Sequence, residues 1–232
     1  IVFTLVMLLS VATNLEAKDK KSVSNFGSSS NYVDSSGSFD GNQIYADVTN
    51  NGLFLDASVS GGSALEWPIN TGIHSVYASA LWMAATVNGS TRGIIGTFTQ
   101  DMGPGPFQGD PLSVVHRIYK VDKAMLAAPL DFDDFQEWPV DFGAPWVDVD
   151  GDGAYSPLPN GPDHPEFIGD QVLWFVSNDG DPAYKLNFGT APLNVEVQTT
   201  MFGFDRPDVF ADMVFLKKLI INKGDDDLLD TY

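Results

Sequence analysis

The sequence predicts an all-β fold: an antiparallel β-sandwich with long Gly/Pro-rich loops and one or two short helices. Three observations support this prediction. Apolar runs of strand length recur along the chain, stretches rich in Gly and Pro separate them, and helical periodicity is scarce. A propeller is disfavoured, because no internal repeat of about 40–50 residues is present.

The first 42 residues are expected to precede the folded domain. Residues 1–17 read as a secretory signal peptide without its basic n-region, because an apolar stretch is followed by small and polar residues. A buried N-terminal strand is the alternative, and the charged, Ser-rich stretch that follows disfavours it. Residues 18–42 are expected to form a flexible Ser/Gly-rich leader, and residues 43–232 a β-rich domain truncated at its C-terminal end.

Two hairpins are expected in the first half of this domain. Residues 44–48 and 53–55 flank Asn50-Asn51-Gly52, and residues 76–87 and 91–98 flank Asn88-Gly89. The second is the stronger signal, because both residues of an Asn-Gly turn adopt positive φ readily.

Further strands are expected at residues 114–121, 172–176, 194–201 and 215–221. The run 172–176 is almost entirely apolar and predicts a central strand, whereas 194–201 alternates and predicts one exposed face. Residues 228–232 are expected to start a strand that returns along 215–221.

Two segments have the composition of short helices, residues 122–126 and residues 131–138. Aspartates at the start of the second segment suit a helix N-terminus, and Pro139 would end that helix.

Charge and cysteine content exclude several classes of protein. The chain has 12 Lys and Arg against 31 Asp and Glu, a net charge of −19, which repels nucleic acid and anionic membranes. It has no cysteine, so disulfides, thiolate nucleophiles and Cys-ligated metals are excluded within these residues. A hydrophobic content of 44% predicts a globular body rather than disorder.

The run from Asp148 to Gly153 is the clearest chemical signal. Asp148, Asp150 and Asp152 fall at positions 1, 3 and 5 of a calcium loop, with Gly153 at position 6. Ala154 would offer its carbonyl at position 7 and Ser156 its hydroxyl at position 9. We therefore predict a Ca²⁺ site here, with a solvated acidic turn as the alternative.

This loop departs from an EF-hand at its end. Position 12 is Pro159 instead of a bidentate Glu, and the surrounding prolines prevent a following helix. A more distant carboxylate must complete the site. Asp163, Glu166 and Asp170 are the candidates, and Asp170 is preferred.

Other acidic and aromatic groups are weaker candidates. Residues 178–181 form a second acidic turn, which an ordinary β-turn explains better than a second ion. A carboxylate pair of the glycosidase kind is conceivable among Asp131, Asp133, Asp134 and Glu137, although a solvated helix face is the more common use of such residues. Trp138 and Trp146 are the tryptophans best placed to stack on sugars, although core packing is favoured.

Several of these segments together resemble a group of large, secreted bacterial surface proteins of unknown biochemical role. The resemblance lies in Glu137-Trp138-Pro139, residues 143–146, Asp148 to Gly153, Tyr155-Ser156-Pro157 and residues 169–174, with Ala80-Leu81-Trp82 and Val87-Asn88-Gly89 upstream. Such proteins often carry a C-terminal sorting domain for type IX secretion, which would lie beyond these residues. The resemblance implies export and a Ca²⁺ loop, and it supplies no catalytic residue to carry over.

The sequence thus predicts a calcium-stabilised β module of a secreted or cell-surface bacterial protein, with a structural, adhesive or binding role. An extracellular glycan or another surface protein is the expected partner, with no nucleic acid and no membrane insertion of the mature chain. A secreted glycan-acting hydrolase and a non-catalytic glycan-binding module are the alternatives.

Overall fold

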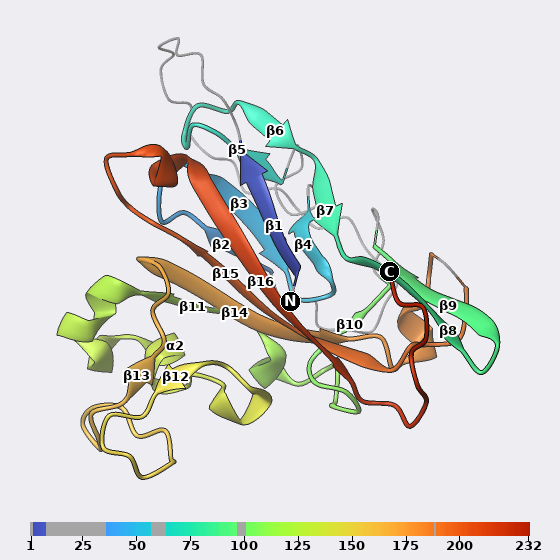
Figure 1. The fold of residues 1–232 in the computed structure, drawn as a ribbon. Coiled ribbons are helices and arrows are strands. Elements are labelled where there is room, and N and C mark those ends of the chain that lie inside the picture. The colour runs from blue at the N-terminus through green and yellow to red at the C-terminus, as the bar shows by residue number, and fades with distance from the viewer. Residues whose placement is uncertain (1, 8–35, 57–63, 97–100, 188) are drawn as a thin grey trace.

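The computed structural model describes residues 2–7, 36–56, 64–96, 101–187 and 189–232 (Figure 1). These residues form antiparallel sheets, with one short α-helix and several 3₁₀ turns among them, so the all-β prediction is confirmed. Within the same residues, no helix has the length and apolar character needed to cross a bilayer.

Three of the larger strands form the centre of a six-stranded sheet. Its order is β1-β16-β15-β14-β10, with β11 also pairing with β14. The members are β1 (Val2–Met7), β10 (Gly103–Pro104), β11 (Tyr119–Asp122), β14 (Gln171–Asn178), β15 (Val195–Gly203) and β16 (Met213–Asn222).

A four-stranded sheet and three strand pairs complete the β structure. The four-stranded sheet has the order β2-β3-β5-β6, from β2 (Ser36–Phe39), β3 (Tyr45–Thr49), β5 (Leu65–Glu66) and β6 (His74–Val76). The pairs are β4 (Leu53–Asp56) with β7 (Ala78–Ala80), β8 (Trp82–Val87) with β9 (Ser90–Ile95), and β12 (Trp146–Val147) with β13 (His164–Pro165).

Helical structure in the described residues is short. The α-helix α2 spans Asp133–Gln136, and the 3₁₀ helices are η1 (Val114–His116), η2 (Lys123–Ala127), η3 (Pro129–Asp131), η4 (Val140–Phe142), η5 (Pro182–Tyr184) and η6 (Val209–Asp212). Both predicted helical segments therefore contain helical turns. The first is a 3₁₀ helix shifted by one residue, and the α-helix in the second is shorter than expected.

Strand β14 lies at the centre of the molecule, as predicted, and all eight of its residues are buried. On one face, Leu173 and Phe175 belong to a core cluster with Phe39 and Val48 of the four-stranded sheet. On the other face, Trp174 packs in a second cluster with residues of the segment 119–168. Because successive side chains of a strand point to opposite faces, β14 needs cover on both sides, and it has both.

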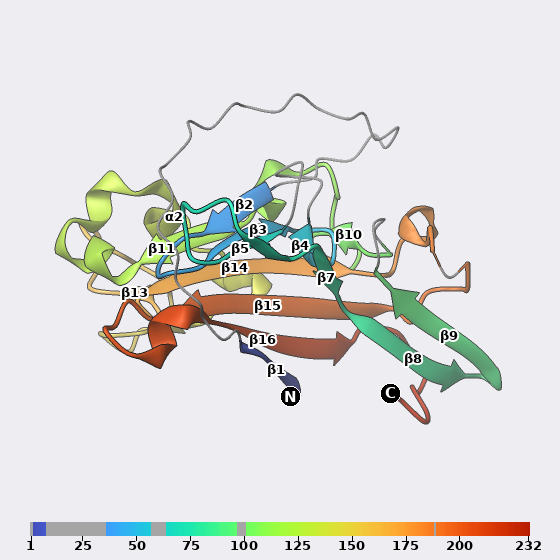
Figure 2. The same cartoon turned by 90° about the horizontal axis from the view of Figure 1, so that it is seen from above.

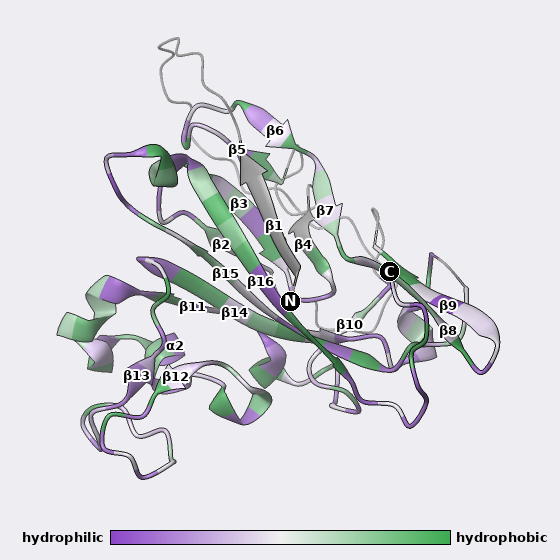
Figure 3. Ribbon diagram, viewed as in Figure 1, coloured by the Kyte–Doolittle hydropathy of each residue, from purple (hydrophilic) through white to green (hydrophobic). Residues whose placement is uncertain are grey.

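A third core cluster lies where the β8–β9 hairpin meets β15. Met83, Val87 and Ile94 of the hairpin join Val195 and Val197 there. Figures 1 and 2 show this hairpin at one end of the molecule and the α2, β12 and β13 region at the other. Figure 3 shows hydrophobic stretches along the long strands. Strand β16 also contains two charged residues, Lys217 and Lys218.

The predicted exposed face of β15 is wrong. Glu196 is 3% exposed, and Thr200 is also buried. The backbone amide of Phe107 donates to Glu196, and the Gln198 amide donates to the carbonyl of Phe142. Loops cover this polar face and satisfy the hydrogen bonds of its side chains. The alternation of polar and apolar residues within a strand does not indicate such cover.

The two predicted hairpins have opposite outcomes. The Asn88-Gly89 turn joins β8 and β9, with φ of 51° and 77° at the two residues. The chain around Asn50-Asn51 does not form a hairpin, because β3 pairs with β2 and β5 while β4 pairs with β7. Buried Asn50 donates to the His116 carbonyl, and Asn51 accepts from the hydroxyl of Thr49, so this corner passes the chain between sheets.

The predicted strand 114–121 is strand only from Tyr119 onward. Residues Val114–His116 instead form η1, and His116 is buried. Within the predicted hairpin strand 91–98, residues 97 and 98 lie outside the described residues.

The outer parts of the domain differ from expectation. Residues 36–39, assigned to the leader, form β2, and the Phe39 side chain is fully buried. Residues 228–232 pair with β8 rather than with β16, through backbone hydrogen bonds of Leu229 with Thr86 and of Tyr232 with Ala84. Residues 2–7 form β1 along β16; removal of residues 1–17 as a signal peptide stays a prediction.

Replacing Phe39 by Ala tests whether the folded body begins before residue 43. Because the ring is fully buried in the main core, we expect the free energy of unfolding to fall by about 3–5 kcal/mol. The matched control is Ser38→Ala on the same strand, expected to change it by less than about 1 kcal/mol. Urea unfolding followed by tryptophan fluorescence measures both, and equal values would contradict the assignment of β2 to the core.

Candidate metal centre

The aspartate loop lies between β12 and β13. Pairing of Trp146 with Pro165 and of Val147 with His164 brings the two ends of the loop together. Tyr155 fixes its middle, because its hydroxyl donates to the Phe135 carbonyl at 2.6 Å and its ring packs edge-on against Trp146. The loop therefore projects from the layer that covers one face of β14.

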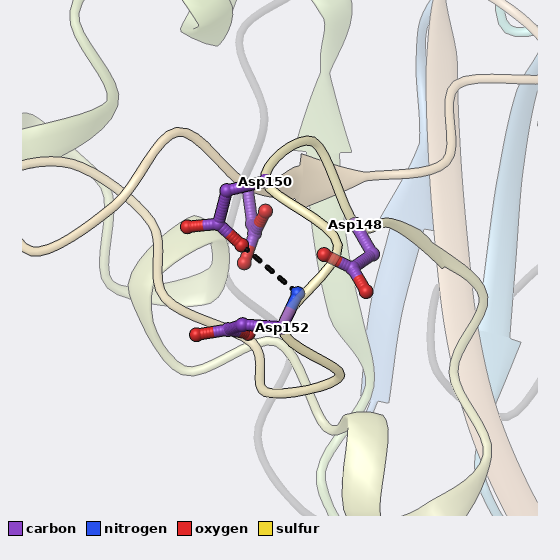
Figure 4. Close-up of side chains that lie close together, drawn as sticks. Asp148, Asp150 and Asp152 are labelled. Carbon is purple, nitrogen blue, oxygen red and sulfur yellow. Dashed lines mark hydrogen bonds between the residues drawn. The ribbon is translucent and has the colours of Figure 1, made fainter.

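Four carboxylates meet in this loop: Asp148, Asp150, Asp152 and Asp163. Each offers one oxygen, and these four oxygens lie within 4.8 Å of one another. Figure 4 shows the three aspartates of the run around the same turn of backbone. Asp148, Asp150 and Asp152 are exposed, whereas Asp163 is 2% exposed.

Backbone amides hold the exposed aspartates in position. Asp148 accepts from the amide of Gly151 at 2.7 Å and from that of Gly153 at 3.0 Å. Both glycines have φ of 78°, a left-handed conformation that L side chains rarely adopt. The Asp152 carboxylate accepts from the amide of Ala154 at 2.8 Å. The glycines of the motif thus allow the loop to fold back on its own acids.

Asp163 is the buried anchor of the loop. Its two oxygens accept from the amides of Val149 and Ser156, at 2.8 and 2.9 Å, and from the Ser156 hydroxyl at 3.2 Å. Burial acts to raise the pKa of Asp163, but these hydrogen bonds outweigh it and hold the pKa below its ordinary value. Asp163 is therefore a carboxylate at neutral pH.

Within the described part of the chain, none of the four carboxylates has a Lys or Arg ion-pair partner. Four negative groups brought together without a cation repel one another, and hard oxygen ligands of this kind suit Ca²⁺. The arrangement can bind a divalent cation; on its own it offers no nucleophile.

The remaining predicted ligands have different positions. Asp163, a candidate from the sequence, takes the place expected of Asp170, which lies outside the group of four. Asp170 instead accepts from the amide of Asp205 at 3.0 Å. The hydroxyl of Ser156 donates to Asp163, so Ser156 supports that carboxylate, and Ala154 is exposed beside the loop. Ligation by any of these residues stays a prediction.

The second acidic turn has a role that the sequence did not indicate. Asp179 is fully buried, and its oxygens accept from the amides of Leu193 and Val195. The buried ammonium of Lys185 lies 3.6 Å from Asp179 and 3.3 Å from buried Asp101. Because Asp101 lies 84 residues from Lys185, no local sequence pattern marks this cluster, and the sequence analysis missed it.

Two of the four proposed glycosidase carboxylates are held in ion pairs. Asp134 and Glu137 both pair with the Arg117 guanidinium, at 2.8 and 2.9 Å. Asp134 also accepts from the Lys120 amide and so joins α2 to β11. Asp131 and Asp133 are exposed on the surface. A structural role explains this group.

The two tryptophans suggested for sugar stacking lie in the core. Trp138 is 3% exposed, and its indole donates to the Pro145 carbonyl. Trp146 is half-buried and packs against Tyr155 in the same cluster. Both rings contribute to the layer below the loop, so this pair gives the stacking hypothesis no support.

Comparison with known proteins finds no protein-family model, no curated protein and no solved structure that matches the chain.

Replacing Asp163 by Asn tests the anchor in the presence of EDTA. Asn keeps one acceptor oxygen but turns an NH₂ group toward an amide donor, so we expect lower stability at neutral pH. Since the pKa of Asp163 is depressed when folded, its contribution is complete above about pH 3.8 and is lost as pH falls through the lower folded value.

Urea unfolding across this pH range measures the effect, with exposed Asp150→Asn as the control. The gap between wild type and Asp163→Asn should shrink in acid. A gap that stayed constant below pH 3.8 would contradict the depressed pKa of Asp163.

Proposed function

We propose that the chain is a calcium-stabilised β module of a secreted or cell-surface bacterial protein, with a structural, adhesive or binding role. The observation that carries the proposal is the meeting of Asp148, Asp150 and Asp152 with buried Asp163 in one exposed loop. Export is supported by the apolar N-terminal pattern and by the resemblance to secreted surface proteins.

The geometry favours a structural ion over a sensor. Asp163 is already fixed by backbone amides, and both ends of the loop are joined by the β12–β13 pair. A bound cation would remove repulsion within a loop that is largely preformed. Extracellular calcium concentrations are high enough to fill even weak sites of this kind.

Ca²⁺ is preferred to Mg²⁺ for this loop. Ca²⁺ accepts six to eight oxygens in a flexible arrangement, whereas Mg²⁺ requires a compact octahedron and retains its waters. Four carboxylates gathered in one loop suit the larger, more tolerant ion.

Thermal unfolding with Ca²⁺ and with EDTA tests the proposal. At a free Ca²⁺ concentration about 100 times Kd, binding to the folded state adds about 2.7 kcal/mol. For a domain of this size, that corresponds to a rise in Tm of roughly 5–10 °C. The Asp150→Asn variant should lose most of the rise.

The matched control is Asp227→Asn, which removes an exposed carboxylate far along the chain from the loop. It should retain the full response to Ca²⁺. If the Tm of the wild-type protein is the same with Ca²⁺ and with EDTA, the loop is a solvated acidic turn and the proposed role of the ion is wrong.

The two alternative functions gain no support from the site. Two of the four candidate hydrolase carboxylates, Asp134 and Glu137, pair with Arg117. Of the candidate stacking rings, Trp138 is buried and Trp146 is half-buried against the same cluster. Partners that fit the proposal are an extracellular glycan or another surface protein, and binding assays on the exported protein would separate them.

A further inference from the structure

The buried cluster of Asp101, Asp179 and Lys185 is the strongest chemical feature outside the aspartate loop. The Lys185 side chain is 3% exposed, and both aspartate side chains are 0% exposed. Its Nζ lies 3.3 Å from Oδ2 of Asp101 and 3.6 Å from Oδ2 of Asp179. The three residues come from the segments that follow β9, β14 and η5.

One cation in this cluster faces two acids. Burial raises the pKa of Asp179, and this outweighs the amides of Leu193 and Val195 and the charge of Lys185. Two carboxylates beside one ammonium, all away from water, favour retention of an extra proton on one acid. The cluster therefore combines an amine, a carboxyl group and an acid suited to hold a proton.

We propose that Lys185 and Asp101 condense to an intramolecular amide, an isopeptide bond, with Asp179 as the proton shuttle. The reaction joins an amine and a carboxylic acid and releases one water. It needs no oxidant, metal or cofactor. This proposal is independent of the calcium site.

The geometry supplies each step. In a dry site, transfer of a proton from the ammonium to the Asp101 carboxylate gives a neutral amine and a neutral carboxylic acid, since an uncharged pair costs less to bury. The Nζ lone pair then attacks Cγ of Asp101 and forms the C–N bond. Protonated Asp179 gives its proton to the departing hydroxyl as the C–O bond breaks and water leaves. It then takes a proton from the nitrogen and ends protonated, as it began.

Backbone amides surround the reacting carboxyl group. The amide of Ile95 donates to Asp101 Oδ2 at 2.9 Å, and the amide of Asn187 donates to Oδ1 at 3.1 Å. Donors placed in this way stabilise the negative oxygen of a tetrahedral intermediate. The Lys185 Nζ is also oriented by a hydrogen bond to the Gly93 carbonyl. Because the fold holds the amine and the carboxyl group in contact, their reaction is unimolecular and avoids a slow bimolecular encounter.

The bond would join two positions 84 residues apart in sequence. It would tie the segment after the β8–β9 hairpin to the segment after η5, in a chain that has no cysteine for a disulfide. A covalent link of this kind resists reducing conditions, and closing a long loop lowers the entropy of the unfolded chain.

Intact mass spectrometry of the purified chain tests the proposal directly. We expect the wild-type mass to be one water below the mass calculated from the sequence. A protease digest should contain a branched peptide that joins Asp101 to Lys185, located by fragmentation. A wild-type mass equal to the calculated one would overturn the proposal and leave a non-covalent ion cluster.

Peptide mapping distinguishes the isopeptide bond from other reactions that release one water. The sequence Asp179-Gly180 can lose water by forming a succinimide, which gives the same mass but no branched peptide. Mapping the loss to a succinimide would also overturn the proposal.

Variants assign the roles. Lys185→Met and Asp179→Asn should both have the full calculated mass, the first without the nucleophile and the second without the shuttle. Lys223→Met, which removes a more exposed lysine 3.5 Å from Glu196, should keep the water loss. Loss of water in Asp179→Asn equal to that in wild type would overturn the shuttle role.

Discussion

The rest of the structure depends on the burial of both faces of β14. A strand with eight buried residues requires a layer on each side, and two unrelated layers meet this requirement. The four-stranded sheet covers one face around Phe39 and Phe175, and the irregular segment around Trp138 covers the other. The aspartate loop projects from this second layer, so its geometry depends on packing against β14.

Features coded by neighbouring residues were predictable from the sequence. The apolar run of β14, the Asn88-Gly89 turn and the acid spacing from Asp148 to Asp152 each depend on a few adjacent positions. Periodicity and turn chemistry act over the same short range, which is why these predictions agree with the fold.

Features set by distant partners could not be predicted. Asn50 lies in a sequence typical of a hairpin turn. Its side-chain amide instead donates a hydrogen bond to the carbonyl of His116, 66 residues away. Loops bury the polar face of β15. The β propensity of the strand gives no information about which loops cover it. The sequence does not distinguish Asp163 from Asp170 as a ligand. Only the hydrogen bonds that Asp163 accepts from Val149 and Ser156 set it apart.

The exposure of the aspartate loop has a consequence for degradation. Its acids and glycines lie on the surface, whereas its ends are joined by β12–β13 and its anchor is buried. Proteases cleave exposed segments that open locally, and mutual repulsion of the acids promotes such opening. With the cation of the proposed function bound, this repulsion is relieved, so proteolytic cleavage at the loop should be slower with divalent cations than with EDTA.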